Sequence, residues 1–336
     1  MQRYQALQNH LSFEEIAGHD RPVTILKRAL ANRTLAHAYL FSGEEGIGKK
    51  MTALALAAAV NCRNAGSSGG CGECPSCRKV AALTHPDVHI LVADGDEIKI
   101  DQVRQTQADL ALKPFEGAKK ILIVDGAESM NQSSANAFLK TLEEPPGETL
   151  IVLITPLPQS LLPTIRSRCQ EIRFLPLPRP ILAQALIRKR GISEEDAWFL
   201  AALAQGSLGR GLAMDVEREK AARKELLALW SGLGHMNAGE VIAQAEVFSK
   251  DRDRLERLLE IGVEWLRDAI VFRVTGDERL LVHGQGKGHH LQWGEGVPLQ
   301  RMLSDMALFT TSRRLLERRV SAQLVAENLL LKLAHG

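Results

Sequence analysis

The sequence predicts an α/β protein whose first half is a parallel sheet covered by helices and whose second half is helical. Three observations support this fold class. Strand-like apolar runs alternate with helical segments up to about residue 175. A glycine-rich loop, GEEGIGK at 43–49, joins the first strand to the first long helix. A proline-rich stretch at 176–180 ends the alternation, and no convincing strand-like run follows it.

The expected elements of the first half follow in chain order. Short apolar runs predict strands at 37–42, 88–92, 119–124, 149–154 and 171–174. Helices are expected between them, at 49–61, 100–112 and 132–143. In the last of these, Ala135, Phe138, Leu139 and Leu142 recur at helical spacing and form an apolar face. Because the strands are apolar on both faces and separated by helices, a parallel sheet is expected.

Length and charge limit the domain organisation and the class of protein. At roughly 100–200 residues per domain, 336 residues suggest two or three domains. We expect a phosphate-loop domain at 1–176, a small helical domain at 177–216 and a longer helical domain at 217–336. A net charge of +2 argues against a protein that coats a polyanion. No apolar run or signal core directs the chain to a membrane, so a cytoplasmic location is expected.

The loop at 43–49 matches the phosphate-loop pattern G-x4-G-K through Gly43, Gly46, Gly48 and Lys49. Glycines let backbone N–H groups converge on phosphate oxygens, and the helix that follows adds the positive end of its dipole. Lys49 would reach the outer phosphates. The simpler alternative is a glycine-rich turn that opens an ordinary helix.

Two departures affect the chemistry of this site. Lys50 stands where Ser or Thr would offer a hydroxyl to magnesium. Thr52 lies about 200° further around the helix and cannot simply replace that hydroxyl. Asp125 ends an apolar strand, as a magnesium-orienting carboxylate should, but Gly126 follows it. Glu128 is expected to be a solvated carboxylate at a helix start rather than a catalytic base. ATP or ADP binding remains open, whereas hydrolysis is not expected.

Four cysteines lie close together, in the spacing Cys62-x8-Cys71-x2-Cys74-x2-Cys77. In a reducing compartment such a cluster indicates a metal site before it indicates disulfides. Four thiolates can close a tetrahedron around zinc at about 2.3 Å and leave no open position, so the site would be structural. An iron–sulfur cluster or unmetallated thiols are the alternatives. Cys169 stands apart and is expected to be a small buried residue.

Several motifs between 13 and 175 carry a resemblance to a known family. They are FEEIAGHD at 13–20, HAYLFSG at 37–43, THPD at 84–87, ANAFLKTLEEPP at 135–146 and TIRSRC at 164–169. Together with the cysteine cluster, these motifs are similar to those of the AAA+ clamp-loader ATPases of bacterial DNA replication. The resemblance implies an AAA+ domain with a zinc module at 62–77, then a helical lid and an all-α collar. It favours zinc over iron–sulfur.

Within that family, the departures distinguish two branches. The tau/gamma motor keeps Gly-Lys-Thr and an Asp-Glu pair, whereas this chain has Lys49-Lys50 and Asp125-Gly126. It therefore resembles the degenerate delta-prime members. The resemblance implies that Arg168 acts in trans as an arginine finger on a neighbour's ATP, although by itself Arg168 would be an ordinary surface residue. It places Thr155 at a nucleotide-sensing position. Arg210 lies one place later than the second sensing arginine.

The resemblance also implies partners and an activity. The chain would be a non-hydrolysing subunit of a hetero-pentamer with tau/gamma and delta subunits, and the complex would place a sliding clamp on primer–template DNA. As a lone chain it is expected to lack ATPase activity, while belonging to the DNA polymerase III holoenzyme, a nucleotidyltransferase. The alternatives are a tau/gamma-type ATPase motor and a zinc-bearing DNA-binding protein outside the clamp loader.

Overall fold

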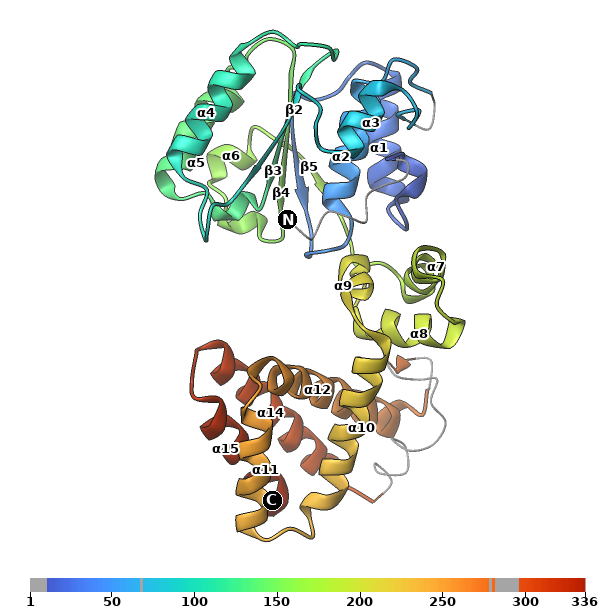
Figure 1. Cartoon of the computed structure of the whole chain (residues 1–336), viewed down its shortest axis with the longest axis vertical. Helices are drawn as coiled ribbons and strands as arrows, with labels where there is room; N and C mark the ends of the chain where they lie inside the picture. Colours follow the sequence, from blue (N-terminus) through green and yellow to red (C-terminus); the bar gives the residue numbers. More distant parts are fainter. Residues whose placement is uncertain (1–10, 67–68, 278–279, 282–295, 336) are drawn as a thin grey trace. The chain divides into compact units, whose positions relative to one another are not determined.

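The computed structural model describes residues 11–66, 69–277, 280–281 and 296–335. The chain forms two compact units (Figure 1). The first contains residues 1–197 and 204–212, and the second contains residues 198–203 and 213–336.

A parallel sheet forms the centre of the first unit. Its order is β2-β3-β4-β1-β5. The strands are β1 (Ala38–Ser42), β2 (Val88–Val92), β3 (Lys120–Asp125), β4 (Thr149–Thr155) and β5 (Gln170–Arg173). Each lies within one residue of the range expected from the sequence. The order places β1 between β4 and β5, so the loop after β1 lies beside the carboxyl ends of both.

The register of the sheet brings the predicted nucleotide-site residues to one edge. Ser42 at the end of β1 pairs with Thr155 at the end of β4, and Asp125 at the end of β3 pairs with Ile154. The Gly43 N–H donates to the Thr155 carbonyl at 3.3 Å and continues this pairing into the loop. The phosphate loop, Asp125 and Thr155 therefore share the carboxyl edge of the sheet.

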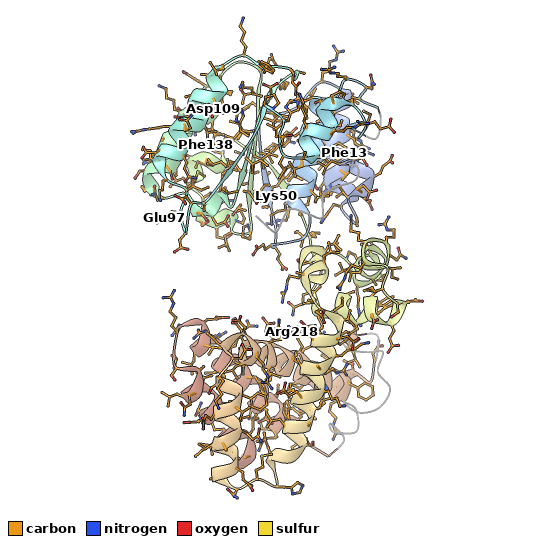
Figure 2. The ribbon with its side chains drawn as sticks, viewed as in Figure 1. Phe13, Lys50, Glu97, Asp109, Phe138 and Arg218 are labelled. Atoms are coloured by element: carbon orange, nitrogen blue, oxygen red, sulfur yellow. The ribbon has the colours of Figure 1, made fainter. Side chains whose placement is uncertain are left out.

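Helices cover both faces of the sheet (Figure 1). One face carries α1 (Asp20–Ala31), α2 (Lys49–Val60) and α3 (Pro75–Ala81). The other carries α4 (Ile100–Ala111), α5 (Gln132–Glu143) and α6 (Pro163–Arg166). Figure 2 shows Phe13 and Phe138 on these opposite sides. Successive β1 residues pack into the two cores alternately, with Phe41 in one and Leu40 in the other, because strand side chains alternate between faces.

Short helices follow the sheet. They are α7 (Arg179–Arg190), α8 (Glu194–Leu203) and α9 (Leu208–Ala213). The predicted linker at 176–180 runs directly into α7, which has a proline in its first turn. Helix α7 ends at Gly191, whose φ of 64° suits the left-handed conformation of a helix C-terminus.

The rest of the second unit is helical in its described residues. Its helices are α10 (Val216–Leu233), α11 (Ala238–Ser249), α12 (Arg252–Thr275), α14 (Leu299–Glu317) and α15 (Ala322–His335). Apolar residues of α12, including Leu258, Leu259 and Leu266, are buried in their common core. Among the described residues, none of these helices has the length and apolar character needed to span a membrane.

The predicted fold class, a parallel α/β domain followed by helices, is therefore confirmed. The finer division at 176 and 216 stays a prediction, since the two compact units do not test it.

Candidate functional site

The phosphate loop connects β1 to α2 and has little room for side chains. Gly43 has a φ of 140°, and a Cβ added there would lie 2.4 Å from the Phe174 carbonyl oxygen. Gly46 has a φ of 75°, and its Cβ would lie 2.4 Å from the Ser207 hydroxyl. Both the left-handed backbone and the close neighbours therefore require glycine. Gly48, with a φ of 115°, immediately precedes α2.

Lys49 is folded back onto the loop that precedes it. Its Nζ donates to the carbonyl oxygens of Gly43 and Glu44, both at 2.5 Å, and the residue is only 5% exposed. Burial lowers the pKa of this ammonium, and the carboxylates of Asp125 and Glu128 oppose the shift. The buried charge is thus satisfied by backbone oxygens. Contact between Lys49 and a phosphate stays a prediction.

Lys50 makes an ion pair with Asp125. Its Nζ lies 2.8 Å from Oδ2 of Asp125, and the two side chains are 23% and 30% exposed. In phosphate-loop ATPases, a Ser or Thr directly after the loop lysine and an Asp at the end of a neighbouring strand hold the magnesium ion. Lys50 and Asp125 stand at the corresponding positions of this chain. Here residue 50 is itself a lysine, and its ammonium, a compact charge with three donors, lies against the aspartate. Figure 2 shows Lys50 at the start of α2, beside the sheet.

Thr52 does not supply the missing hydroxyl. The residue is fully buried, and its Oγ1 donates to the Gly48 carbonyl at 3.0 Å, one turn earlier in the helix. The expectation that Thr52 cannot take over the role of residue 50 agrees with this geometry.

Glu128 differs from the sequence-based expectation of a solvated carboxylate. The residue is half-buried, and its Oε2 is enclosed without a hydrogen-bond partner among the described residues. The reason lies in Gly126, whose φ of 85° starts a 3₁₀ turn at Ala127–Ser129 and reverses the chain after Asp125. The Glu128 carboxylate consequently acts electrostatically on Lys49. In the sequence, the glycine directly after the strand was the available signal for this turn.

Thr155 and the segment after α8 complete the surroundings of the loop. Thr155 is fully buried, and its Oγ1 accepts a hydrogen bond from the Leu157 N–H at 3.0 Å. The Ser207 hydroxyl donates to the Glu45 carbonyl at 2.9 Å, and the Gly209 N–H donates to the Gly46 carbonyl at 2.8 Å. The segment containing Arg210 therefore contacts the phosphate loop through the Ser207 side chain and the Gly209 main chain.

His19 is a further residue at the loop that the sequence did not single out. Its Nε2 donates to the Ile47 carbonyl at 2.6 Å, and the residue is 3% exposed. Burial lowers the pKa of His19, which favours the neutral ring. His19, Ser207 and Gly209 therefore each donate a hydrogen bond to one of the loop carbonyls of residues 45–47.

Arg168 lies apart from these lysines. It follows α6 and precedes the edge strand β5. Its NH2 lies 2.7 Å from Oε1 of Glu143, and its NH1 donates to the Thr164 carbonyl at 3.0 Å. These partners belong to α5 and α6, whereas Lys49 and Lys50 belong to α2. Nothing in the sequence identified Glu143 as a partner of Arg168.

The four cysteines of the predicted metal site lie together. Their Sγ atoms are all within 4.8 Å of one another, and those of Cys62 and Cys74 are 3.9 Å apart. Tetrahedral bonds of about 2.3 Å place thiolates about 3.8 Å apart, so the cluster could hold a metal ion such as zinc. Backbone N–H groups of Asn64 and Cys71 point at the Cys62 sulfur, both at 3.3 Å. Cys169 lies elsewhere and is half-buried.

Thiol acidity differs within the cluster. Burial raises the pKa of Cys74, but N–H groups of Cys77 and Arg63, together with the thiols of Cys77 and Cys71, outweigh burial and bring it to about 6. For Cys77, burial raises the pKa strongly. A cation shared by the four sulfurs would favour the thiolate form of each.

The THPD motif ties the cysteine module to the sheet. The Asp87 N–H donates to Nδ1 of His85, which leaves Nε2 to donate to the Ser76 hydroxyl at 3.0 Å on α3. The Asp87 carboxylate is fully buried and accepts from the backbone N–H groups of residues 115, 116 and 117, at 2.6, 2.9 and 2.7 Å. Burial raises the pKa of Asp87, but these three bonds outweigh it and hold the pKa below its usual value.

We expect Asp87→Asn to destabilise the sheet-containing unit by about 2–3 kcal/mol at neutral pH, because three backbone N–H groups lose a charged acceptor that is itself fully buried. A depressed folded pKa stabilises the protein above the unfolded value of about 3.9, and this stabilisation is lost as pH falls through the folded value. The difference between wild type and variant should therefore shrink only below about pH 4. Urea unfolding of both proteins between pH 3 and pH 7 measures this difference in the free energy of unfolding. Asp94→Asn, at an exposed position, should change stability by less than about 0.5 kcal/mol.

Comparison with known proteins adds the family context. A family model described as "DNA polymerase III, delta subunit" matches residues 18–178. The chain is 30% identical over 324 residues to a DNA polymerase III subunit delta' of Bacillus subtilis, covering 94% of this chain and 96% of the relative. It is 34% identical over 245 residues to a subunit delta' of Pseudomonas aeruginosa, covering 72% and 74%. A DNA polymerase III subunit tau of Bacillus subtilis is 30% identical over 211 residues, which cover 60% of this chain and 37% of that relative.

Proposed function

This chain belongs to the delta-prime family of DNA polymerase III subunits, and from that premise we propose that it is a non-hydrolysing subunit of a clamp loader. In this role it would help to place a sliding clamp on primed DNA during replication, as part of the polymerase holoenzyme. Such a role places its action in the cytoplasm, where the bacterial chromosome lies.

The ion pair between Lys50 and Asp125 carries the proposal that the chain does not hydrolyse ATP. A magnesium ion that approaches Asp125 would meet an ammonium 2.8 Å from Oδ2 of this carboxylate, and like charges would oppose its approach. The hydroxyl ligand is absent as well, and Gly126 offers no carboxylate to activate water. The site therefore lacks both the usual hydroxyl ligand of the metal and the carboxylate that usually activates water.

The purified chain is expected to show no ATP hydrolysis above that of its Lys49→Ala variant, with or without magnesium. Lys49→Ala is the appropriate control because it removes the ammonium at the loop while leaving Lys50 in place. A phosphate-release assay measures both proteins. Substantial turnover by the wild-type chain that Lys49→Ala abolishes would overturn the proposal and favour a tau/gamma-type motor.

For the assembly, we propose a hetero-pentamer with tau/gamma and delta subunits, acting on the clamp and on primer–template DNA. Arg168 would complete the ATP site of a neighbouring motor subunit. A guanidinium opposite the leaving phosphate stabilises transition-state charge, and its planar fork is not reproduced by lysine. Partial exposure of Arg168 supports this role, since its side chain is 36% exposed on a loop at the sheet edge.

We expect Arg168→Ala to leave assembly intact while lowering DNA-stimulated ATPase and clamp loading by at least about tenfold, given the larger effects of such arginines in GTPases. Gel filtration of the reconstituted complex measures assembly, and phosphate release measures turnover. Arg166→Ala, at an exposed arginine two residues earlier at the end of α6, is the matched control and should behave like wild type. Unchanged loading by Arg168→Ala would remove the arginine from the mechanism.

We further propose that the four clustered cysteines bind one structural zinc ion. With four protein ligands the metal has no open position, so it would order the loop between α2 and α3 rather than take part in a reaction. The fit of the thiol distances to a tetrahedral site supports this assignment.

Elemental analysis should therefore find about one zinc per chain, and Cys74→Ser should lose it. Cys169→Ser is the matched control, because Cys169 lies outside the cluster, and it should retain the metal. Iron and sulfide with visible absorption would instead indicate an iron–sulfur cluster. A metal-free wild type that keeps its α3 region protected in hydrogen exchange would exclude a structural metal.

A further inference from the structure

The Arg168 guanidinium is held at two points by different elements. Its NH1 donates to the Thr164 carbonyl of α6 at 3.0 Å, and its NH2 pairs with Oε1 of Glu143 at the end of α5, at 2.7 Å. Charge-assisted bonds of this length are among the stronger hydrogen bonds of proteins. Since arginine has five N–H donors, the two contacts leave others for an incoming phosphate.

The position of Glu143 is set by the core and does not depend on Arg168. Helix α5 is capped at its start by Asn131, which accepts from the Ser134 N–H at 3.0 Å. Phe138 and Leu142 bury the helix against the sheet, with 1% and 2% exposure. Helices α5 and α6 lie on the same face of the sheet (Figure 1). The backbone from which the Glu143 carboxylate extends is thus fixed independently of Arg168.

The ion pair contributes little to folding. The Arg168 and Glu143 side chains are 36% and 50% exposed, and pairs this accessible are screened by water and salt. What the pair does restrict is the rotamer freedom of a long side chain. A guanidinium that is already oriented loses less entropy when it meets a phosphate, and correct orientation lowers the barrier of the reaction.

We propose that Glu143 is a positioning residue for Arg168. It holds the guanidinium at the corner between α5 and α6, so that the arginine meets the neighbouring subunit's ATP already oriented. This inference rests on the proposed function, in which Arg168 acts on that ATP.

The test uses the reconstituted complex with clamp and primed DNA. Glu143→Gln keeps the shape of the side chain and removes its charge. We expect kcat for ATP hydrolysis to fall about threefold to tenfold through lost orientation, with KM for ATP unchanged, because the motor's own loop binds the nucleotide. Glu144→Gln, an exposed carboxylate one residue later, should match wild type. Thermal unfolding of the lone chain should be the same for both variants, which separates positioning from folding.

A double variant tests the positioning role of Glu143 separately from the proposed role of Arg168. If Glu143 acts through Arg168, then Glu143→Gln combined with Arg168→Ala should be no slower than Arg168→Ala alone. An additional loss in the double variant would mean that Glu143 acts independently and would overturn the positioning role. Wild-type kcat in Glu143→Gln, with a slow Arg168→Ala, would also overturn it and leave the proposed function standing. Wild-type kcat in Arg168→Ala would reject the proposed function itself.

Discussion

The ion pair between Lys50 and Asp125 is the interaction on which the character of the nucleotide domain depends. In a phosphoryl-transfer site, the corresponding positions share a divalent ion that arrives with the nucleotide and leaves with the products. Here the cation is covalently attached to α2 and lies 2.8 Å from the carboxylate. The carboxyl edge of the sheet is therefore neutralised without metal or nucleotide. The proposal that the chain does not hydrolyse ATP rests on this arrangement, because a fixed ammonium would oppose the approach of a divalent cation.

The contacts around the phosphate loop have the same consequence. Lys49 donates to the first loop carbonyls, while His19, Ser207 and Gly209 donate to later ones. Gly46 cannot accept a Cβ without meeting Ser207. Each of these bonds forms between parts of the same chain, so the loop is ordered without a ligand. In the proposed role, such a loop would present the same surface to neighbouring subunits at every step of their cycle.

Patterns in the sequence were sufficient to predict the strands of the sheet but not the side-chain contacts at its edge. Fully buried parallel strands are continuous apolar runs, so their limits were predictable to within one residue. The cysteine cluster was predictable because its ligands are local. The partner of Lys50 is 75 positions away, and that of Arg168 depends on where two helices meet. Glu128 was misjudged because a single left-handed glycine turned it inward. Periodicity carries information about burial, whereas such pairings depend on tertiary geometry.

Lys50 and Arg168 illustrate how burial decides what a paired cation can do. The Lys50 pair is the less exposed of the two, at 23% and 30%, and Coulomb attraction strengthens as water is excluded. The Arg168 pair, at 36% and 50%, is screened more and can exchange one acceptor for another at small cost. In the proposed role, a phosphate carried by a neighbouring subunit would meet the N–H groups of Arg168 that Glu143 and Thr164 leave over, while the Lys50 ammonium keeps its place beside Asp125. Two paired cations of one chain would then have different roles, one at its own loop and one at a neighbour's.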